Sequence, residues 1–320
     1  MAKTLLLVAS LAFTTSAFGQ SPTYPIKPVR VVVPYAPGGS GDVVARTVGI
    51  KLTEAWGQQF LIDNKPGASG NIGTDFVAKA PADGYTLLLG TDIQMAINPH
   101  IYKALPFVPN RDFAPVVLGA FIEFVIAASP ALPVTNLAEL VAYAKRNPGK
   151  LSYASSGVGS THHLSMEWLK SVAGIDMVHV PYKGSGQIMP DLISNQVQLA
   201  YTGIAQTMPH VKAGKLKAIA IGAARRLDAA PGVPTIAETY PGIETNASWN
   251  FFAPAGTPRD VIAKLNAQIN QVLITPDVSE RLIGQGLFPI GGTPEQLSAR
   301  MNADYEKWGK VVRQVGLKED

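Results

Sequence analysis

The sequence contains no cysteine among its 320 residues, which excludes disulfide bridges, thiolate metal sites and cysteine nucleophiles. Charged residues are scarce, at 16% against 47% hydrophobic residues, a composition typical of globular rather than disordered chains. Beyond the N-terminal segment, no apolar run reaches a membrane-spanning length without charges or prolines. Long runs of lysine and arginine are also missing, so the net charge of +4 does not indicate a nucleic-acid partner and suits an acidic small ligand equally well.

Common catalytic signatures are missing as well. The segment 38–42 (Gly-Gly-Ser-Gly-Asp) departs from the nucleophile elbow at its last position. Gly157-Val158-Gly159 opens a dinucleotide fingerprint, but His162 stands where the third glycine belongs. His162 and His163 are neighbours on an expected helix and point in different directions, so they make a poor metal pair. We therefore predict a protein that is not an enzyme and that holds no cofactor and no metal.

The first residues have the features of an export signal. Lys3 gives the positive start, residues 5–13 form a short apolar core, and Ala17 and Gly19 stand at the −3 and −1 positions of a cleavage site before Gln20. We expect residues 1–19 to be a signal peptide and the mature protein to be periplasmic. A chain of 320 residues exceeds one ordinary core, which predicts two lobes.

The stretch 29–46 organises the rest of the chain. Val29 to Val33 form a β-branched run typical of a buried strand, and the prolines at 34 and 37 end it. The glycines at 38, 39 and 41 permit a close approach to a bound group, and Ser40 or Asp42 is expected to cap the following helix. Free N–H groups at such a helix start form an anion site. This loop either holds a ligand carboxylate or is a tight turn without a ligand.

Strands and helices alternate along the chain, which favours mainly parallel sheets with helices on both faces. Two long strands, 115–129 and 245–252, are expected to cross between the lobes. Glu123 lies in the first crossing strand and either faces solvent or pairs across the hinge. We expect lobe 1 at 20–122 and 250–320, and lobe 2 at 123–249. Expected helices include 137–146, 162–172, 187–194, 260–273, 277–283 and 293–315.

A second polar glycine loop, Ser155 to Thr161, precedes the helix expected from about residue 162. Ligands of α/β sheets bind beyond the carboxyl ends of strands. The loops at 35–42 and 155–161, one in each lobe, are therefore expected to face each other across a cleft.

These residues resemble a known family, the substrate-binding proteins of tripartite tricarboxylate transporters, often called the Bug family. The resemblance covers essentially the whole mature chain, in the right order. Its motifs here are Tyr24-Pro25 with Lys27-Pro28-Val29-Arg30, the stretch 33–39 with Asp42, Asn64-Lys65-Pro66-Gly67-Ala68 with Gly70-Asn71-Ile72-Gly73, the stretch 81–86, Tyr153 to Gly157, Gly159-Ser160, His163-Leu164 and Val180-Pro181-Tyr182-Lys183-Gly184.

The resemblance implies an α/β, two-lobed periplasmic binding protein of type II, which closes on a ligand like a Venus flytrap with two crossing strands as its hinge. It implies capture of a small organic acid for delivery to membrane transporter subunits; we expect a monomer without a nucleic-acid partner. The two facing loops are expected to hold a ligand carboxylate, with further residues of the pocket setting specificity. The ligand-binding residues expected are Tyr35, Pro37, Gly38, Gly39, Ser40, Asp42, Thr91, Asp92, Ser155, Ser156, Gly157, Ser160, Thr161, His162, Tyr201, Thr202 and Trp249.

Two other functions remain open at this stage. An exported isomerase or lyase on a similar frame needs an acid–base pair, for which the candidates are Asp42 with His162 or His163. A sensor partner that presents its ligand to a signalling protein uses the same binding site. The ligand also remains open among di- or tricarboxylates, amino acids, aromatic acids and neutral compounds.

Overall fold

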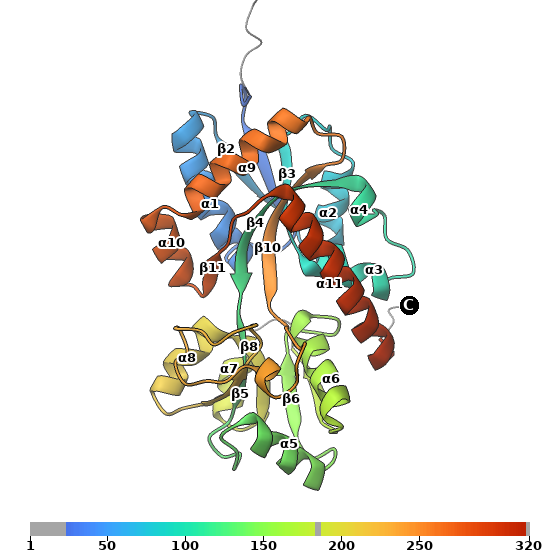
Figure 1. Ribbon diagram of the computed structural model, residues 1–320, viewed down its shortest axis with the longest axis vertical. Coiled ribbons are helices and arrows are strands. Elements are labelled where there is room, and N and C mark those ends of the chain that lie inside the picture. The colour runs from blue at the N-terminus through green and yellow to red at the C-terminus, as the bar shows by residue number, and fades with distance from the viewer. Residues whose placement is uncertain (1–23, 183–186, 318–320) are drawn as a thin grey trace, which may run out of the picture.

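Two β-sheets organise residues 24–182 and 187–317, the part of the chain that the computed structural model describes. We call the body built on the six-stranded sheet lobe 1 and the body built on the five-stranded sheet lobe 2; they are the upper and lower bodies of Figure 1. The expected signal peptide and the motif residues Lys183 and Gly184 lie outside the described residues. The residue boundaries given above for the two lobes stay predictions.

Six strands form the sheet of lobe 1: β1 (Val29–Val33), β2 (Phe60–Asn64), β3 (Thr86–Thr91), β4 (Phe113–Ile122), β10 (Ala247–Pro254) and β11 (Leu287–Pro289). Their order is β11-β4-β10-β3-β1-β2. β1 pairs in parallel with β2 and β3, whereas β10 runs antiparallel to β3 and β4, and β11 runs antiparallel to β4.

Five strands form the sheet of lobe 2: β5 (Phe124–Ala128), β6 (Ser152–Ser155), β7 (Val178–Pro181), β8 (Leu199–Gly203) and β9 (Lys217–Ile221). Their order is β7-β6-β8-β5-β9, with parallel pairs around β6 and antiparallel pairs around β5. Both sheets are therefore mixed, and the expectation of mainly parallel pairing was wrong. Hydrophobic periodicity shows where a strand lies but carries no information about its direction.

The helices of lobe 1 are α1 (Ser40–Trp56), α2 (Asn71–Ala78), α3 (Asn98–Ile101), α4 (Pro109–Asp112), α9 (Arg259–Leu273), α10 (Pro276–Ile283) and α11 (Pro294–Val315), with a 3₁₀ turn η1 (Ala68–Gly70) and a π-helical turn η2 (Ile93–Ile97). Those of lobe 2 are α5 (Leu137–Arg146), α6 (Thr161–Ala173), α7 (Ile188–Ile193) and α8 (Ile204–Lys212), with a 3₁₀ turn η4 (Ile236–Glu238). Across residues 24–182 and 187–317, no helix has the length and apolar character needed to cross a membrane.

The first crossing segment is two strands rather than one. β4 ends at Ile122 in the sheet of lobe 1, and β5 begins at Phe124 in the sheet of lobe 2. Glu123, between them, is buried, and its Oε1 accepts a hydrogen bond from Nδ2 of Asn246 at 3.2 Å. Asn246 directly precedes β10, so this bond joins the two crossing segments. Of the two interpretations of Glu123, the structure shows pairing across the hinge.

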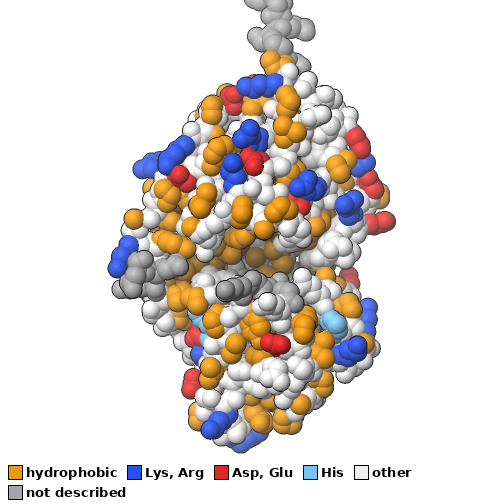
Figure 2. All heavy atoms as spheres, turned by 180° about the vertical axis from the view of Figure 1, so that it is seen from behind, with side chains coloured by type: hydrophobic (Ala, Val, Ile, Leu, Met, Phe, Trp, Pro, Cys, Tyr) orange, Lys and Arg blue, Asp and Glu red, His pale blue; other side chains and the backbone are white. Residues whose placement is uncertain are grey.

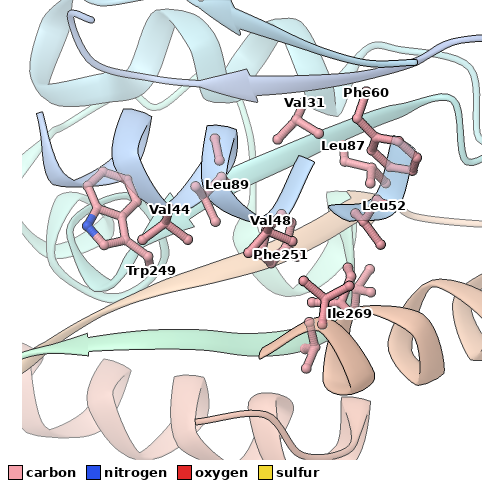
Figure 3. Close-up of a cluster of buried hydrophobic side chains, with 14 of the residues drawn as sticks. Val31, Val44, Val48, Leu52, Phe60, Leu87, Leu89, Trp249, Phe251 and Ile269 are labelled. Atoms are coloured by element: carbon pink, nitrogen blue, oxygen red, sulfur yellow. The ribbon is translucent and has the colours of Figure 1, made fainter. Parts of the chain in front are cut away.

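One face of α1 anchors that helix to the sheet of lobe 1. Val44, Val48 and Leu52 follow one another at a spacing of four residues and share a buried cluster with Leu89 and Phe251 (Figure 3). Burial of an aliphatic side chain of this size stabilises a fold by about 1.5–3 kcal/mol. This packing fixes the position of the first turn of α1, which lies at the cleft.

The C-terminal helix α11 contacts both lobes. Trp308 and Val312 of α11 belong to one apolar cluster with Ile97 of η2 and Leu164 of α6. Figure 1 shows α11 running down the side of lobe 1 past α3 towards α6. From the sequence we assigned residues 250–320 to lobe 1, and the packing of α11 against α6 of lobe 2 is a finding of the structure.

Candidate functional site

An open cleft of about 780 Å³ lies between the two lobes. Figure 2 shows the hollow between the two bodies, with hydrophobic side chains inside it. Most of the residues expected to bind ligand line this cleft together: Tyr35, Pro37, Gly38, Gly39, Ser40, Asp42, Thr91, Asp92, Ser156, Ser160, Thr161, His162 and Trp249. Their contact with a ligand stays a prediction.

The first turn of α1 forms the lobe 1 rim of the cleft. Gly39 is the N-cap residue, with extended backbone, and no side chain caps the helix. Ser40 and Asp42 lie inside the helix, so the expected cap was wrong. Oδ2 of Asp42 instead accepts the N–H of Gly38 at 3.1 Å and the Nε–H of Arg46 at 2.9 Å. The Arg46 guanidinium lowers the pKa of Asp42, so this carboxylate is ionised and charge-paired.

Trp249 of β10 packs directly on that turn. Its Nε1 donates a hydrogen bond to Oγ of Ser40 at 3.0 Å, and its ring meets Tyr35 edge to face at 5.6 Å between centroids. A β-carbon on Gly41 would lie only 2.5 Å from the indole. Position 41 must therefore be glycine for the indole to rest against α1.

A buried amide holds Tyr35 and Thr91 in place. Nε2 of Gln94 donates to the Tyr35 hydroxyl at 2.7 Å, and Oε1 of Gln94 accepts the backbone N–H of Thr91 at 3.0 Å. Burial raises the pKa of Tyr35 to about 12, so its hydroxyl stays protonated. Gln94 itself does not line the cleft and supports Tyr35 and Thr91 from within lobe 1.

The lobe 2 rim is the turn that begins α6. Oγ of Ser160 accepts the N–H of His163 at 3.2 Å and donates to the carbonyl of Gly157 at 2.7 Å, which gives the side-chain cap expected of this loop. Oγ of Ser156 lies 2.6 Å from Nδ1 of His162. Burial lowers the pKa of His162 to about 4, so its imidazole is neutral near pH 7.

Two stacked imidazoles support this loop from the side away from the cleft. His163 and His179 lie 3.9 Å apart between ring centroids. Nδ1 of His163 accepts the N–H of Gly159 at 3.2 Å, and Nε2 of His179 lies 2.6 Å from Oγ of Ser155. Burial lowers the pKa of both rings, to about 4 for His179. Because the His163 ring is neutral, its Nδ1 carries no proton and can accept the hydrogen bond from the Gly159 N–H.

A hydrogen bond between Asp92 and Thr161 crosses the cleft. Oγ1 of Thr161, the first residue of α6, donates to Oδ2 of Asp92 at the end of β3 at 3.3 Å. Asp92 is 1% exposed, and its Oδ1 has no partner among the described residues. Burial and the nearby Asp304 carboxylate raise the pKa of Asp92 to about 7.

Four expected residues, Ser155, Gly157, Tyr201 and Thr202, do not line the cleft. Ser155 is buried against His179, as described above. Gly157 has a φ of 129°, and its carbonyl accepts the hydrogen bond from Oγ of Ser160. Tyr201 and Thr202 are buried in β8, and the Tyr201 hydroxyl bonds to Thr245. Neighbouring residues of a strand point to opposite faces of its sheet, and β8 is buried on both faces, so both side chains lie in the interior of lobe 2.

The cleft also includes residues that we had not singled out. Ile122 and Phe124 of the crossing strands form an apolar wall. Ile204, Ala205 and Gln206 of the lining come from the start of α8. Residues Gln285, Gly286 and Leu287 come from the α10–β11 connection. The sequence offers one signal for these residues, the strand end at Thr202-Gly203, which directly precedes α8. No local sequence motif marks the α10–β11 connection as part of the cleft.

The charge of the lining is acidic. Among the described lining residues, the charged side chains are Asp42 and Asp92, and that set includes no lysine or arginine. In the described part of the chain, no three histidine, aspartate or glutamate side chains gather as a metal site would require. Such a lining can hold an anion through the backbone N–H groups and hydroxyls that both helix starts present, and through the side-chain N–H groups of Gln206 and Gln285, without a cationic side chain.

Comparisons with known proteins agree with this geometry. Residues 44–317 match the family model described as the tripartite tricarboxylate transporter family receptor. A protein from the tcbD-tcbE intergenic region of Pseudomonas sp. (strain P51) is 36% identical over 312 residues, covering 96% of this chain and 93% of its own. Protein BugT of Bordetella pertussis is 34% identical over 319 residues, covering 98% of both chains.

Solved structures show the same arrangement. A periplasmic transporter protein is 40% identical, with a TM-score of 0.81, covering 93% of this chain and 100% of its own. Rpa4515 of R. palustris, solved with adipate, is 36% identical with a TM-score of 0.81, covering 92% and 99%. MatC of Rhodopseudomonas palustris, solved with malate, is 32% identical with a TM-score of 0.77, covering 90% and 100%. The chain thus has the two-lobed fold of periplasmic binding proteins, and it belongs to the tripartite tricarboxylate transporter family of receptors.

Proposed function

We propose that this protein is a periplasmic receptor that captures a small carboxylate-bearing ligand in the cleft and delivers it to the membrane subunits of a tripartite tricarboxylate-type transporter. One observation carries the proposal: two helix starts, at Gly39–Ser40 and Ser160–Thr161, line one cleft from opposite lobes. Amides at a helix start favour anions. The relatives solved with adipate and malate support a carboxylate ligand.

The hinge gives capture a mechanism. The chain passes between the sheets at Glu123 and again before Ala247. Rotation about these crossings brings the two helix starts together or apart. A ligand that contacts both starts has its full set of hydrogen bonds only in the closed form, so binding shifts the population towards closure. A charge-assisted hydrogen bond contributes about 1.5–3 kcal/mol to this preference.

We propose binding without catalysis. Asp42 is paired with Arg46, which lowers its pKa, and burial lowers the pKa of His162 to about 4. Near neutral pH these two groups are a carboxylate and a neutral imidazole, so neither is a strong proton donor. The acid–base pair considered for a lyase or isomerase therefore has no acid near neutral pH. Asp92, whose pKa is raised to about 7, also lines the cleft, so the test must show that the ligand is recovered unchanged.

A thermal-shift screen against small carboxylates and their neutral amides tests this function. A ligand at a hundredfold excess over its Kd stabilises a fold by about 2.7 kcal/mol, which visibly raises the Tm. We expect carboxylate hits that are recovered unchanged after incubation, from a protein that elutes as a monomer. Hits confined to neutral compounds would contradict carboxylate capture, and a chemically altered hit would indicate an enzyme.

A further inference from the structure

The two helix starts at the cleft differ in the charge that the protein itself supplies. In the first turn of α1, Asp42 is neutralised by Arg46 at 2.9 Å. At the first turn of α6, the nearby carboxylate is Asp92, which extends from lobe 1 to Thr161 of lobe 2. The α1 start therefore keeps its attraction for an external anion, whereas the α6 start already faces an acidic group.

Asp92 has no direct counter-ion among the described residues. The nearest cations, Arg300 and Lys307 of α11, each bind Asp304, at 2.6 Å in both cases. Asp92 is almost completely buried, and one of its oxygens is without a partner in the described chain. An unpaired buried carboxyl of this kind is costly, which points to a role in the cleft rather than in the core.

We propose that Asp92 acts as a built-in carboxylate at the α6 end of the cleft, so that the ligand carries one carboxylate, held at the α1 end, and an uncharged far end. This inference rests on the proposed function and specifies its ligand class. A dicarboxylate spanning both helix starts would place its second carboxylate beside Asp92. Two carboxylates that share a site cannot both ionise without a large free-energy penalty.

The apolar part of the lining supports the same ligand class. Ile122, Phe124 and Ile204 line the cleft, and they offer apolar surface rather than hydrogen-bond partners. A hydrocarbon skeleton gains from this contact, whereas a hydroxylated skeleton loses hydrogen bonds to water that these residues do not replace. The expected ligands are therefore monocarboxylates with a mainly apolar body.

The electrostatic surroundings set the pH at which this selection is strongest. Asp304 raises the pKa of Asp92, in addition to burial, while Lys307 and Arg300 lower it, with a result of about 7. The hydroxyl of Tyr35, which also interacts with Asp92, is neutral in this range. Asp92 is thus mostly ionised at pH 8 and mostly protonated at pH 6.

Length-matched pairs of ligands test the inference at pH 8. Succinate, glutarate and adipate are each compared with their monoamides, in which a neutral amide replaces one carboxylate without a change of size. We expect the monoamide to bind the purified protein at least about tenfold more tightly than its diacid, as measured by calorimetry. Asp92→Asn should reduce this ratio to about threefold or less by improving the affinity for the diacid.

Asp83→Asn is the matched control, because Asp83 is a partly exposed carboxylate of lobe 1 outside the cleft lining. It should keep the wild-type ratio, and the circular dichroism of both variants should match that of the wild type. A diacid preferred by the wild type, with a ratio that Asp92→Asn leaves unchanged, would overturn the inference while leaving carboxylate capture intact. If no acid or monoamide of the set binds to any of the three proteins, the inference is overturned together with carboxylate capture.

Discussion

The indole nitrogen of Trp249 donates a hydrogen bond to the hydroxyl of Ser40 at 3.0 Å, which joins the returning strand β10 to the first turn of α1. We expect this bond to stabilise the folded protein by about 0.5–1.5 kcal/mol, the usual contribution of one intramolecular hydrogen bond. A double-mutant cycle of Trp249→Phe and Ser40→Ala, followed by urea unfolding, measures this coupling free energy. Strictly additive effects of the two substitutions would show that the bond contributes nothing.

Two neighbouring glycines should respond differently to a side chain. At Gly39, whose φ is −78°, a β-carbon would meet nothing closer than the Ala36 carbonyl at 3.7 Å. At Gly41, a β-carbon would overlap the ring of Trp249. We expect Gly39→Val to keep the wild-type Tm but to lose ligand binding, because the new side chain would obstruct the helix start. Retained affinity in this variant would rule out the loop as the carboxylate site.

The matched substitution Gly41→Ala should instead lower stability, because the indole must move to admit the new methyl group. Overpacking of this kind typically costs about 1–3 kcal/mol. Urea unfolding measures this cost, and tryptophan fluorescence reports the displaced ring. Wild-type stability together with an unchanged emission spectrum would show that the indole has room that the structure does not indicate.

The sequence predicts much of the fold because its local signals are strong. The valine run 29–33, the glycine loop 155–161 with the helix after it, and the segment 260–273 each produce the expected element. Strand direction was missed, since the pairing of β10 with β3 and β4 depends on contacts far apart in the chain. The break between β4 and β5 at Glu123 was also missed, because an apolar run has the same sequence pattern whether it forms one strand of one sheet or two strands of two sheets.

Within the site, the two loops could be found from sequence because glycine, serine and a following helix lie together in the chain. The burial of Tyr201 and Thr202 could not be found, because a polar strand end has the same sequence pattern whether it reaches the cleft or stays in the interior of lobe 2. The α10–β11 connection was invisible for another reason: it reaches the cleft through the packing of Gly286 against Ala205 of the opposite lobe. Such contacts are set by lobe geometry and leave no local motif.

Arg300 links α11 to the hinge. Its Nε donates to Oδ2 of Asp304 at 2.6 Å, and its Nη2 donates to Oδ1 of Asn246 at 2.8 Å, next to Glu123. Arg300→Met should destabilise the protein by about 1.5–3 kcal/mol, because buried Asp304 loses one charge-assisted hydrogen bond while Lys307 remains as its counter-ion. Arg281→Met, a substitution in the last turn of α10, is the control. Equal stability of the two variants would contradict a role for Arg300 in holding the hinge.

The raised pKa of Asp92 makes a prediction about stability and pH. Folding moves this pKa from its ordinary value of 3.8 to about 7, so the folded state favours the protonated carboxyl. Its contribution to stability is fully present below pH 4 and is lost as the pH rises through 7. Asp92→Asn removes this loss of stability, which amounts to about 1.4 kcal/mol for each unit by which folding raises the pKa of Asp92. We therefore expect the variant to exceed the wild type in free energy of unfolding at pH 8 and the two to converge towards pH 4, as measured by urea unfolding across this range. A constant difference between the two proteins at every pH would show that Asp92 titrates alike in the folded and unfolded states.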